Sequence, residues 1–253
     1  MFYPTKKSSC SSIARIFKEN ARSSHLWQLK KTSVCSSTEE ELSHWLKSKP
    51  FLGDHPRAFF SDKQMAGVGQ RGRSWLSPSG GVWVSAVLPM TVKNCHSQLL
   101  GLAVALALAE RLELRNIDVL IKWPNDLIVG DLKLAGILPR LVLRGNQLLY
   151  ARVGLGLNVA NPVPKEGISL EKISGINVNK RVDFWSAEVL LALEKAMIII
   201  SKPKYVCSEV KKRLWSKEYF ESTSKSNWII DGIEIDGALK IRNGSQLKSI
   251  RNL

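Results

Sequence analysis

The sequence predicts an α+β protein, with a mixed β-sheet flanked by helices and followed by a small all-β module. Short runs rich in β-branched and aromatic residues, bounded by glycine, proline and asparagine, recur between residues 57 and 159. Two long apolar stretches, near 99–114 and 186–201, have the length of helices that pack on a sheet. From about Phe220 the chain changes to short strands separated by Asp-Gly and Asn-Gly turns.

The N-terminal half supplies the first strands and helices in a clear order. A strand is expected at 25–31. A helix follows, because the hydroxyl residues 36–38 precede three glutamates, which suit a helix N-terminus, and it stops before Pro50. Strands are expected at 57–61 and 82–88, separated by a glycine-rich loop, and the Ala/Leu-rich helix at 99–114 follows them.

The second half of the chain is expected to add further strands to the sheet and then two helices. A strand at 117–123 ends at Pro-Asn-Asp, and a hairpin at 127–138 turns around Gly130-Asp131. Another strand pair surrounds 144–146 and ends at Val159. Helices are expected at 186–201 and at 203–217, where proline suits the first helical position.

Composition narrows the class of protein. The chain has 253 residues, 44% hydrophobic and 23% charged, which is typical of soluble globular proteins and leaves room for one large and one small domain. No apolar run is long enough to span a bilayer. The net charge is +15, but Lys and Arg are spread along the chain, so we expect no specific nucleic-acid partner and no membrane partner. The cysteines show no C-x-x-C spacing, which favours free thiols in a reducing, cytoplasmic compartment.

Residues 1–21 are basic and rich in serine, and we expect them to be poorly ordered. This composition is found in organellar transit peptides and also at the ragged start of a cytosolic protein, and both interpretations stay open. We expect a catalytic domain at 22–205, then a linker helix and C-terminal module at 206–253.

The stretch AGVGQRGRSWLSP, residues 66–78, contains the pattern G-x-G-x-x-G. In a dinucleotide-binding fold such a loop must open a helix, whose N-terminus meets phosphate. Here Pro78 and two glycines follow, then a strand, so this context argues against a dinucleotide site. The loop is expected instead to bring backbone N–H groups and the guanidinium groups of Arg71 and Arg73 close to an anion.

Further motifs accompany the loop in a fixed order. They are Ser37-Thr38, Gln64, Lys-Trp-Pro-Asn-Asp-Leu at 122–127, Lys-Leu-Ala-Gly-Ile-Leu at 133–138, and Gly-Leu-Gly-Leu-Asn at 154–158. With the loop, they resemble the biotin protein ligase family over roughly residues 25–160. The resemblance implies that the C-terminal module is an SH3-like β-barrel. It also implies a two-step reaction, in which biotin and ATP form biotinyl-adenylate and a lysine of a carrier protein then takes the biotinyl group.

The resemblance also implies roles for individual residues. Lys133 and Arg73 would be catalytic and neutralise carboxylate and phosphate oxygens. The residues expected to bind biotin are Ser37, Thr38, Glu39, Gln64, Val68, Gly69, Gln70, Lys133, Gly136, Gly154 and Gly156. The residues expected to bind ATP are Gly67, Arg71, Gly72, Arg73, Trp75, Lys122, Asn125, Asp126 and Asn158, with Asp126 also a ligand of Mg²⁺. The cofactors and substrates implied are ATP, biotin and Mg²⁺.

Some positions depart from the family pattern. Glu39 stands where asparagine is usual, Val68 and Gln70 where arginine is common, and Arg140 where an acid is common. A basic group at the loop helps retain the adenylate, so its absence bears on how tightly that intermediate is held.

Three other functions are weighed against the ligase. A lipoate or octanoate ligase shares the adenylate chemistry, but Lys-Trp-Pro-Asn-Asp favours biotin. A biotin-sensing repressor needs a helix-turn-helix unit, for which about two dozen residues before the first motif are too few. A non-catalytic biotin-binding protein would not need Lys133 and Arg73. The expected partner is the biotin carboxyl carrier protein of acetyl-CoA carboxylase, and the expected state is a monomer or a ligand-promoted homodimer.

Overall fold

The computed structural model describes residues 8–21, 26–53, 55–90, 97–145, 147–173, 178–221 and 226–251. Its helices are α1 Cys10–Asn20, α2 Thr38–Ser48, α3 Ser97–Glu113, α4 Val182–Ile199 and α5 Pro203–Lys212. Its larger sheet holds β1 Gln28–Cys35, β2 Arg57–Gln64, β3 Val82–Leu88, β4 Leu120–Lys122, β5 Asp126–Val129, β6 Leu132–Arg144 and β7 Gln147–Leu157. The smaller sheet holds β8 Glu218–Glu221, β9 Ser226–Ile233, β10 Leu239–Asn243 and β11 Gln246–Ile250.

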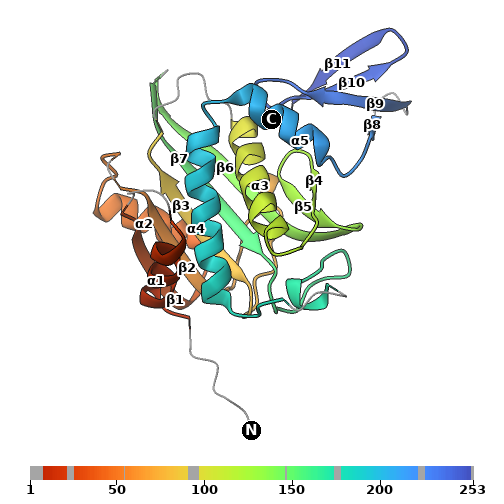
Figure 1. Cartoon of the computed structure of the whole chain (residues 1–253). Helices are drawn as coiled ribbons and strands as arrows, with labels where there is room; N and C mark the ends of the chain where they lie inside the picture. The colour runs from red at the N-terminus through yellow and green to blue at the C-terminus, as the bar shows by residue number, and fades with distance from the viewer. Residues whose placement is uncertain are drawn as a thin grey trace.

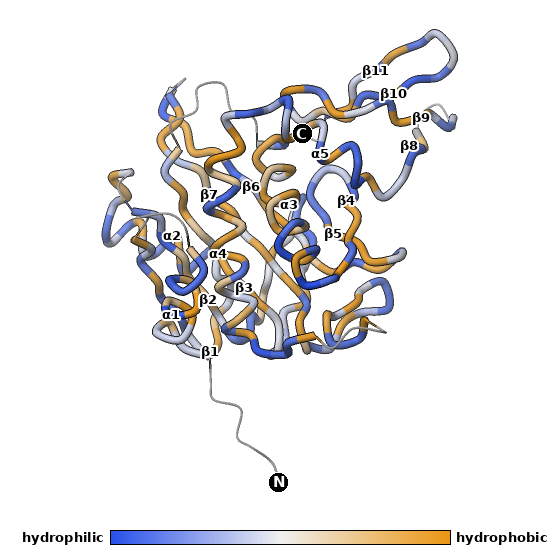
Figure 2. The backbone as a smooth tube through the Cα atoms, in the orientation of Figure 1, coloured by the Kyte–Doolittle hydropathy of each residue, from blue (hydrophilic) through white to orange (hydrophobic). Residues whose placement is uncertain are grey.

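The larger sheet is mixed, as the sequence predicts. Its strand order is β1-β2-β3-β7-β6-β5-β4, in which β1 and β2 are parallel and the other neighbours antiparallel. Helices α3 and α4 lie side by side across one face of it (Figure 1). Both helices are hydrophobic along most of their length (Figure 2), because they are buried between the sheet and each other.

The opposite face of the sheet is shared between α2 and the candidate site. Side chains alternate along β3, so Val84 and Ala86 join the main core beneath α3 and α4 while Val87 packs with Leu42 and Trp45 of α2. Ser37 caps α2 as predicted, since its hydroxyl accepts a hydrogen bond from the backbone N–H of Glu39 at 3.2 Å.

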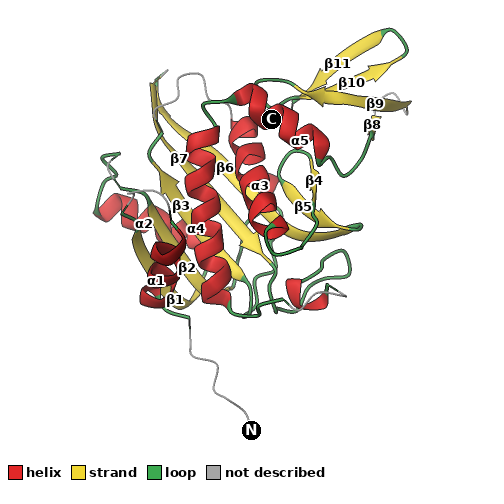
Figure 3. Ribbon diagram, viewed as in Figure 1, coloured by secondary structure: helices red, strands yellow, loops and turns green. Residues whose placement is uncertain are grey.

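The C-terminal module is a four-stranded antiparallel sheet, β11-β10-β9-β8, consistent with an SH3-like domain (Figure 3). Trp228, Leu239 and Ile241 form its small core. It is attached to the larger domain near the site, because the indole N–H of Trp123 donates to the carbonyl of Gly237 at 2.9 Å.

The expectation that residues 1–21 are poorly ordered is wrong for residues 10–20, which form α1 and pack against α4. Ser9 begins the helix with a capping box to Ser12. Ile13, Ile16 and Phe17 lie at positions i, i+3 and i+4, so one face of the helix is apolar and buried. Residues 1–7 and 22–25, which include His25 at the start of the strand expected at 25–31, lie outside the described residues.

Some boundaries also differ from the prediction. The strand expected at 117–123 covers only Leu120–Lys122, and the last helix ends at Lys212 instead of residue 217. After that helix, Leu214 forms a parallel β-bridge with Ile121 of β4. This bridge ties the segment after α5 to the edge strand of the larger sheet. No helix among the described residues is long and apolar enough to cross a membrane.

Candidate active site

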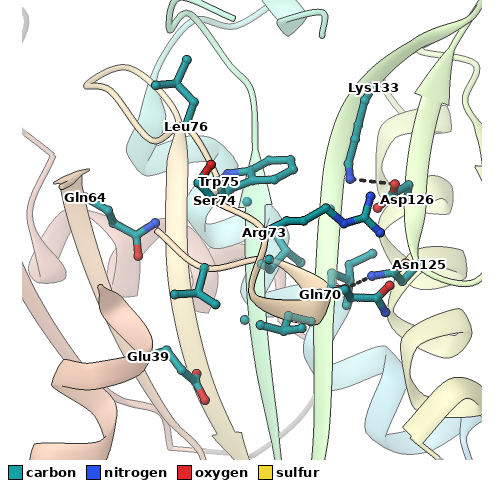
Figure 4. Close-up of a pocket in the computed structure, with 18 of the residues that line it drawn as sticks. Glu39, Gln64, Gln70, Arg73, Ser74, Trp75, Leu76, Asn125, Asp126 and Lys133 are labelled. Atoms are coloured by element: carbon teal, nitrogen blue, oxygen red, sulfur yellow. Dashed lines mark hydrogen bonds and ion pairs between the residues drawn. The ribbon is translucent and has the colours of Figure 1, made fainter. Parts of the chain in front are cut away.

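A cavity of about 550 Å³ opens on the face of the sheet next to α2. Its floor is made by strands β6 and β7, where Gly136 lies opposite Gly156 and Leu138 opposite Gly154 in register. Glycines in neighbouring strands leave room for a ligand to approach the backbone closely. The walls are the start of α2, the glycine loop and β5 (Figure 4).

One end of the cavity holds a network of uncharged polar side chains, and Glu39, the neighbour of Thr38 in the chain, also lines the cavity. The Oε1 atom of Gln64 accepts from the backbone N–H and the hydroxyl of Thr38, at 2.8 and 3.0 Å. The Gln64 amide donates to Ser77 at 2.8 Å, and the hydroxyl groups of Thr38 and Ser85 are 2.9 Å apart. This network fixes the orientations of the donors and acceptors that a polar, neutral ligand group would meet.

The other end is charged. Lys133 Nζ lies 2.6 Å from Asp126 Oδ2 and 4.9 Å from the centre of the Trp75 ring. Arg73 extends from the glycine loop toward the same place (Figure 4). The Lys133 backbone is fixed, because its N–H donates to Glu166 and its carbonyl accepts from Ile168. This end therefore offers two cations to an anionic ligand.

The glycine loop is a narrow hairpin and opens no α-helix, which agrees with the argument against a dinucleotide site. Backbone bonds join Gly69 to Arg73 and Trp75 to Gly67, and the tip is a short 3₁₀ turn, Gln70–Gly72. A Cβ at Gly67 would come within 2.5 Å of the Trp75 carbonyl oxygen, so only glycine fits where the two arms cross.

The ring of Trp75 lies on the glycine floor of the cavity. Its indole lies against Gly136 and Gly156, since a Cβ at Gly156 would be 2.5 Å from Trp75 Nε1. That Nε1 atom is buried and has no hydrogen-bond partner within the described part of the chain. An unpaired buried donor is costly, so a ligand that pairs it or displaces the ring gains free energy.

Comparison with known proteins identifies the domain. Residues 33–158 match the model of the biotin/lipoate A/B protein ligase family. The chain carries a biotin/lipoate ligase domain. The bifunctional ligase/repressor BirA of Escherichia coli is 33% identical over 130 residues, which are 49% of this chain and 40% of that protein. The biotin–[acetyl-CoA-carboxylase] ligase of Paracoccus denitrificans is 36% identical over 101 residues, 39% of this chain and 42% of that protein.

Structural comparison extends the likeness beyond this domain. The biotin protein ligase of Aquifex aeolicus, solved with biotin and ATP, superimposes with a TM-score of 0.70 at 24% identity, over 88% of this chain and 95% of that one. At 24% identity, the structural similarity establishes that the two proteins share a fold. The sequence alignments span only about 40% of the first curated relatives' own length.

The ligase domain brings most of the expected site residues into one cavity. The residues that line it are Ser37, Thr38, Glu39, Gln64, Val68, Gly69, Gln70, Arg73, Trp75, Asn125, Asp126, Lys133, Gly136, Gly154, Gly156 and Asn158. Asn125 is held by its amide, which donates to the Ile137 carbonyl, and Asn158 by its amide, which donates to the Lys133 carbonyl. The roles assigned to these residues remain predictions.

Four expected residues do not line this cavity. Gly67 lies in the glycine loop, at the point where the two arms of the loop cross. Arg71 and Gly72 line a second cavity of about 400 Å³ beside it. Lys122 places its Nζ 4.4 Å from the centre of the Trp215 ring and so is stacked on the linker after α5.

Sequence reasoning missed several residues of the cavity. Ser85 lies in the otherwise apolar strand β3, and a lone hydroxyl in such a strand is the signal that was available. Glu166 and Gly167 come from a loop after β7 that carries no motif, and only the tertiary fold brings them to Lys133. Arg152 does not line the cavity, but it donates to Ser43 and to the carbonyl of Glu39, both at 2.8 Å, and so supports the α2 wall.

Two of the departures from the family pattern are in contact. Glu39 Oε1 lies 3.0 Å from Arg152 and 3.9 Å from Arg140, so the unusual acid and the unusual base compensate each other's charge. Cys35, at the end of β1 beside this corner, is buried, and burial raises the pKa of its thiol. It is therefore protonated near neutral pH and not a nucleophile.

Proposed function

We propose that this protein is an ATP-dependent biotin–protein ligase. It activates biotin as biotinyl-5'-adenylate and transfers the biotinyl group to a lysine of a biotin carboxyl carrier protein. One observation carries the proposal: a single cavity joins the neutral polar network of Thr38 and Gln64 to the cationic end at Lys133. Biotin has this polarity, with a neutral ureido ring at one end and a carboxylate at the other.

The cationic end suits the adenylation step. The carboxylate of biotin attacks the α-phosphate of ATP, so two anions must approach each other. Lys133 and Arg73 supply positive charge for the carboxylate and phosphate oxygens, and the N–H groups of the glycine loop add donors. Pyrophosphate leaves, and the mixed anhydride retains the activated acyl group for the acceptor lysine.

The residues at this end also fit a magnesium ion brought by ATP. Mg²⁺ is usually held by one or two carboxylates together with substrate phosphates. Asp126 and Glu166 both line the cavity, and they would hold the ion while it screens the phosphate charge. Among the described residues no cluster of three His, Cys, Asp or Glu could hold a metal without the nucleotide.

The acceptor is inferred from the relatives' names. The Paracoccus denitrificans relative is named for acetyl-CoA carboxylase, so we propose the biotin carboxyl carrier subunit of that enzyme as the acceptor. The free protein is proposed to be a monomer or a homodimer that ligand promotes. Light scattering with and without biotin and ATP tests this, since a mass that does not change with ligand contradicts ligand promotion.

Biotin-dependent exchange between ATP and labelled pyrophosphate tests the adenylation step directly. We expect exchange with biotin and none with lipoate or octanoate. Exchange with lipoate or octanoate alone would assign the protein to the other branch of the family. No exchange with any of the three acids, in protein that still binds biotin by calorimetry, would leave a binding protein without catalysis.

A further inference from the structure

Asn161 lies in the loop that follows β7, three residues beyond the last sequence motif of the ligase domain. Its side chain is 2% exposed, and it lines neither of the two cavities described above. We propose that Asn161 is a positioning residue, which holds Lys133 in place for adenylate formation through the side chain of Asn158. The inference rests on the proposed ligase function.

Three hydrogen bonds connect Asn161 to the backbone of Lys133. The backbone N–H of Val159 donates to Asn161 Oδ1, and Asn161 Nδ2 donates to Asn158 Oδ1, both at 3.0 Å. Asn158 Nδ2 donates in turn to the carbonyl of Lys133 at 3.3 Å. This chain of bonds runs from a main-chain donor to a main-chain acceptor through two amide side chains.

The polarity of the chain of bonds permits one orientation of each amide. A backbone N–H only donates, so the oxygen of Asn161 must face Val159 and its nitrogen must face Asn158. The oxygen of Asn158 then faces Asn161, which leaves the Asn158 nitrogen to face the Lys133 carbonyl. Without Asn161, the Asn158 amide can turn over and present its oxygen to that carbonyl, where two acceptors repel each other.

The surroundings of Asn161 leave its side chain little freedom. Its Nδ2 atom also donates to the Pro162 carbonyl at 3.0 Å. A Cβ at Gly81 would lie 2.9 Å from Asn161 Oδ1, and a Cβ at Gly80 would lie 3.1 Å from the Asn161 backbone nitrogen. The two glycines therefore let the turn before β3 pack closely against this buried amide.

Lys133 stands at an irregular point of the sheet, where the strand pairing alone supports it weakly. The register between β5 and β6 shifts between Leu127 and Ile128, and Ile128 is the partner of Lys133. On the other side, β7 pairs with β6 only from Ala135 onward. The backbone of Lys133 is therefore held on that side by the loop after β7.

The side chains of Asn158 and Asn161 form the buried part of this support. The Lys133 N–H donates to the carbonyl of Glu166 at 2.8 Å, and the Lys133 carbonyl accepts from the N–H of Ile168 at 3.0 Å. Glu166 is exposed and Ile168 half-buried, whereas Asn158 and Asn161 are 5% and 2% exposed. A reacting group must be held within a fraction of an ångström, so a fixed, buried anchor next to Lys133 bears on the rate.

The experiment separates positioning of Lys133 from general support of the fold. Asn161→Ala should lower the single-turnover rate of biotinyl-adenylate formation about tenfold at saturating biotin and ATP, because Lys133 is misplaced. In a Lys133→Ala background the same substitution should change the rate little, since the group that it positions is gone. Asn161→Asp keeps the size of the side chain and the acceptor for Val159 but loses the donor to Asn158. It should therefore slow the reaction as Asn161→Ala does, and it carries the test if Asn161→Ala does not fold.

Ser186→Ala is the control for a purely structural loss. It removes another buried hydrogen bond, from Ser186 to the Val182 carbonyl at 2.8 Å, in α4 on the other face of the sheet. It should lower the thermal midpoint and leave the adenylation rate unchanged. A wild-type rate in the folded Asn161 variants, or an equal loss with and without Lys133, overturns the proposal. Failure of the ligase proposal shows separately, as absence of biotin-dependent exchange in the wild-type protein.

Discussion

Lys133 and Asp126 form an ion pair of 2.6 Å across the antiparallel strands β5 and β6, and Lys133 Nζ lies 4.9 Å from the centre of the Trp75 ring. The lysine is thus held by the carboxylate that the resemblance assigns to Mg²⁺. Binding of an anionic ligand at this end requires the lysine to exchange one oxyanion partner for another. The pair keeps the ammonium group in place before substrate arrives, so it is preorganised for charge that develops later.

Removal of this ammonium group should slow adenylate formation. Lys133→Ala should lower the single-turnover rate of biotinyl-adenylate formation by about 10²–10³-fold, the loss seen when one preorganised oxyanion donor is removed. Quenched-flow measurement with labelled ATP gives this rate. Lys172→Ala, at an exposed position, is the control and should behave as wild type. A wild-type rate in Lys133→Ala would remove the residue from the mechanism.

A methyl group should be tolerated less well at Gly156 than at Gly154, two glycines of the cavity floor. At Gly156 a Cβ would lie 2.5 Å from Trp75 Nε1, whereas at Gly154 the nearest atom, Leu138 Cβ, is 3.4 Å away. Gly156→Ala should therefore displace the Trp75 ring and raise the KM for biotin more than Gly154→Ala does. Adding Trp75→Phe to Gly156→Ala should recover part of the loss, because the smaller ring makes room. Equal effects at both glycines, unrelieved by Trp75→Phe, would contradict this account.

The contributions of Glu39 and Arg152 to the free energy of unfolding should be coupled. Both side chains are largely buried, and Arg152 also holds the first turn of α2 through the Glu39 carbonyl and Ser43. Arg152→Met should leave the Glu39 carboxylate without its closest cation and cost about 3–5 kcal/mol of unfolding free energy. Glu39→Gln in the same protein should restore part of that loss. Urea unfolding of the four proteins measures the coupling, and additive single effects would show that the pair does not interact.

The N-terminal helix should be part of the folded domain. Phe17→Ala should lower the unfolding free energy by about 3–5 kcal/mol, as expected for a buried aromatic side chain, because it opens a cavity against α4. Lys18→Ala, its exposed neighbour, should change the free energy little. Thermal and urea unfolding give both values. If Phe17→Ala matched Lys18→Ala, α1 would not be docked in solution.

The sequence predicted the strands and helices best where local patterns were strong. The apolar strand at 82–88 and the hairpin around Gly130 appear at the predicted places, because a run of β-branched and aromatic residues and turn chemistry both act over a few residues. The helix α1 was missed although Ile13, Ile16 and Phe17 have helical spacing, since serine and basic residues dominate that segment. The strand at 117–123 is shorter than predicted because its pairing with β5 spans only Leu120 to Lys122.

The motifs determined the family resemblance and most of the cavity, because their residue types and spacing are dictated by the ligand chemistry they would serve. Only the tertiary structure decided which of those residues line the larger cavity and which lie elsewhere. The left-handed turn at Arg71 separates it from Arg73, and Lys122 stacks on Trp215 away from Asp126, its neighbour in register. Glu39 meets Arg152 across more than a hundred residues. Such contacts depend on how strands and helices pack, which no local spacing encodes.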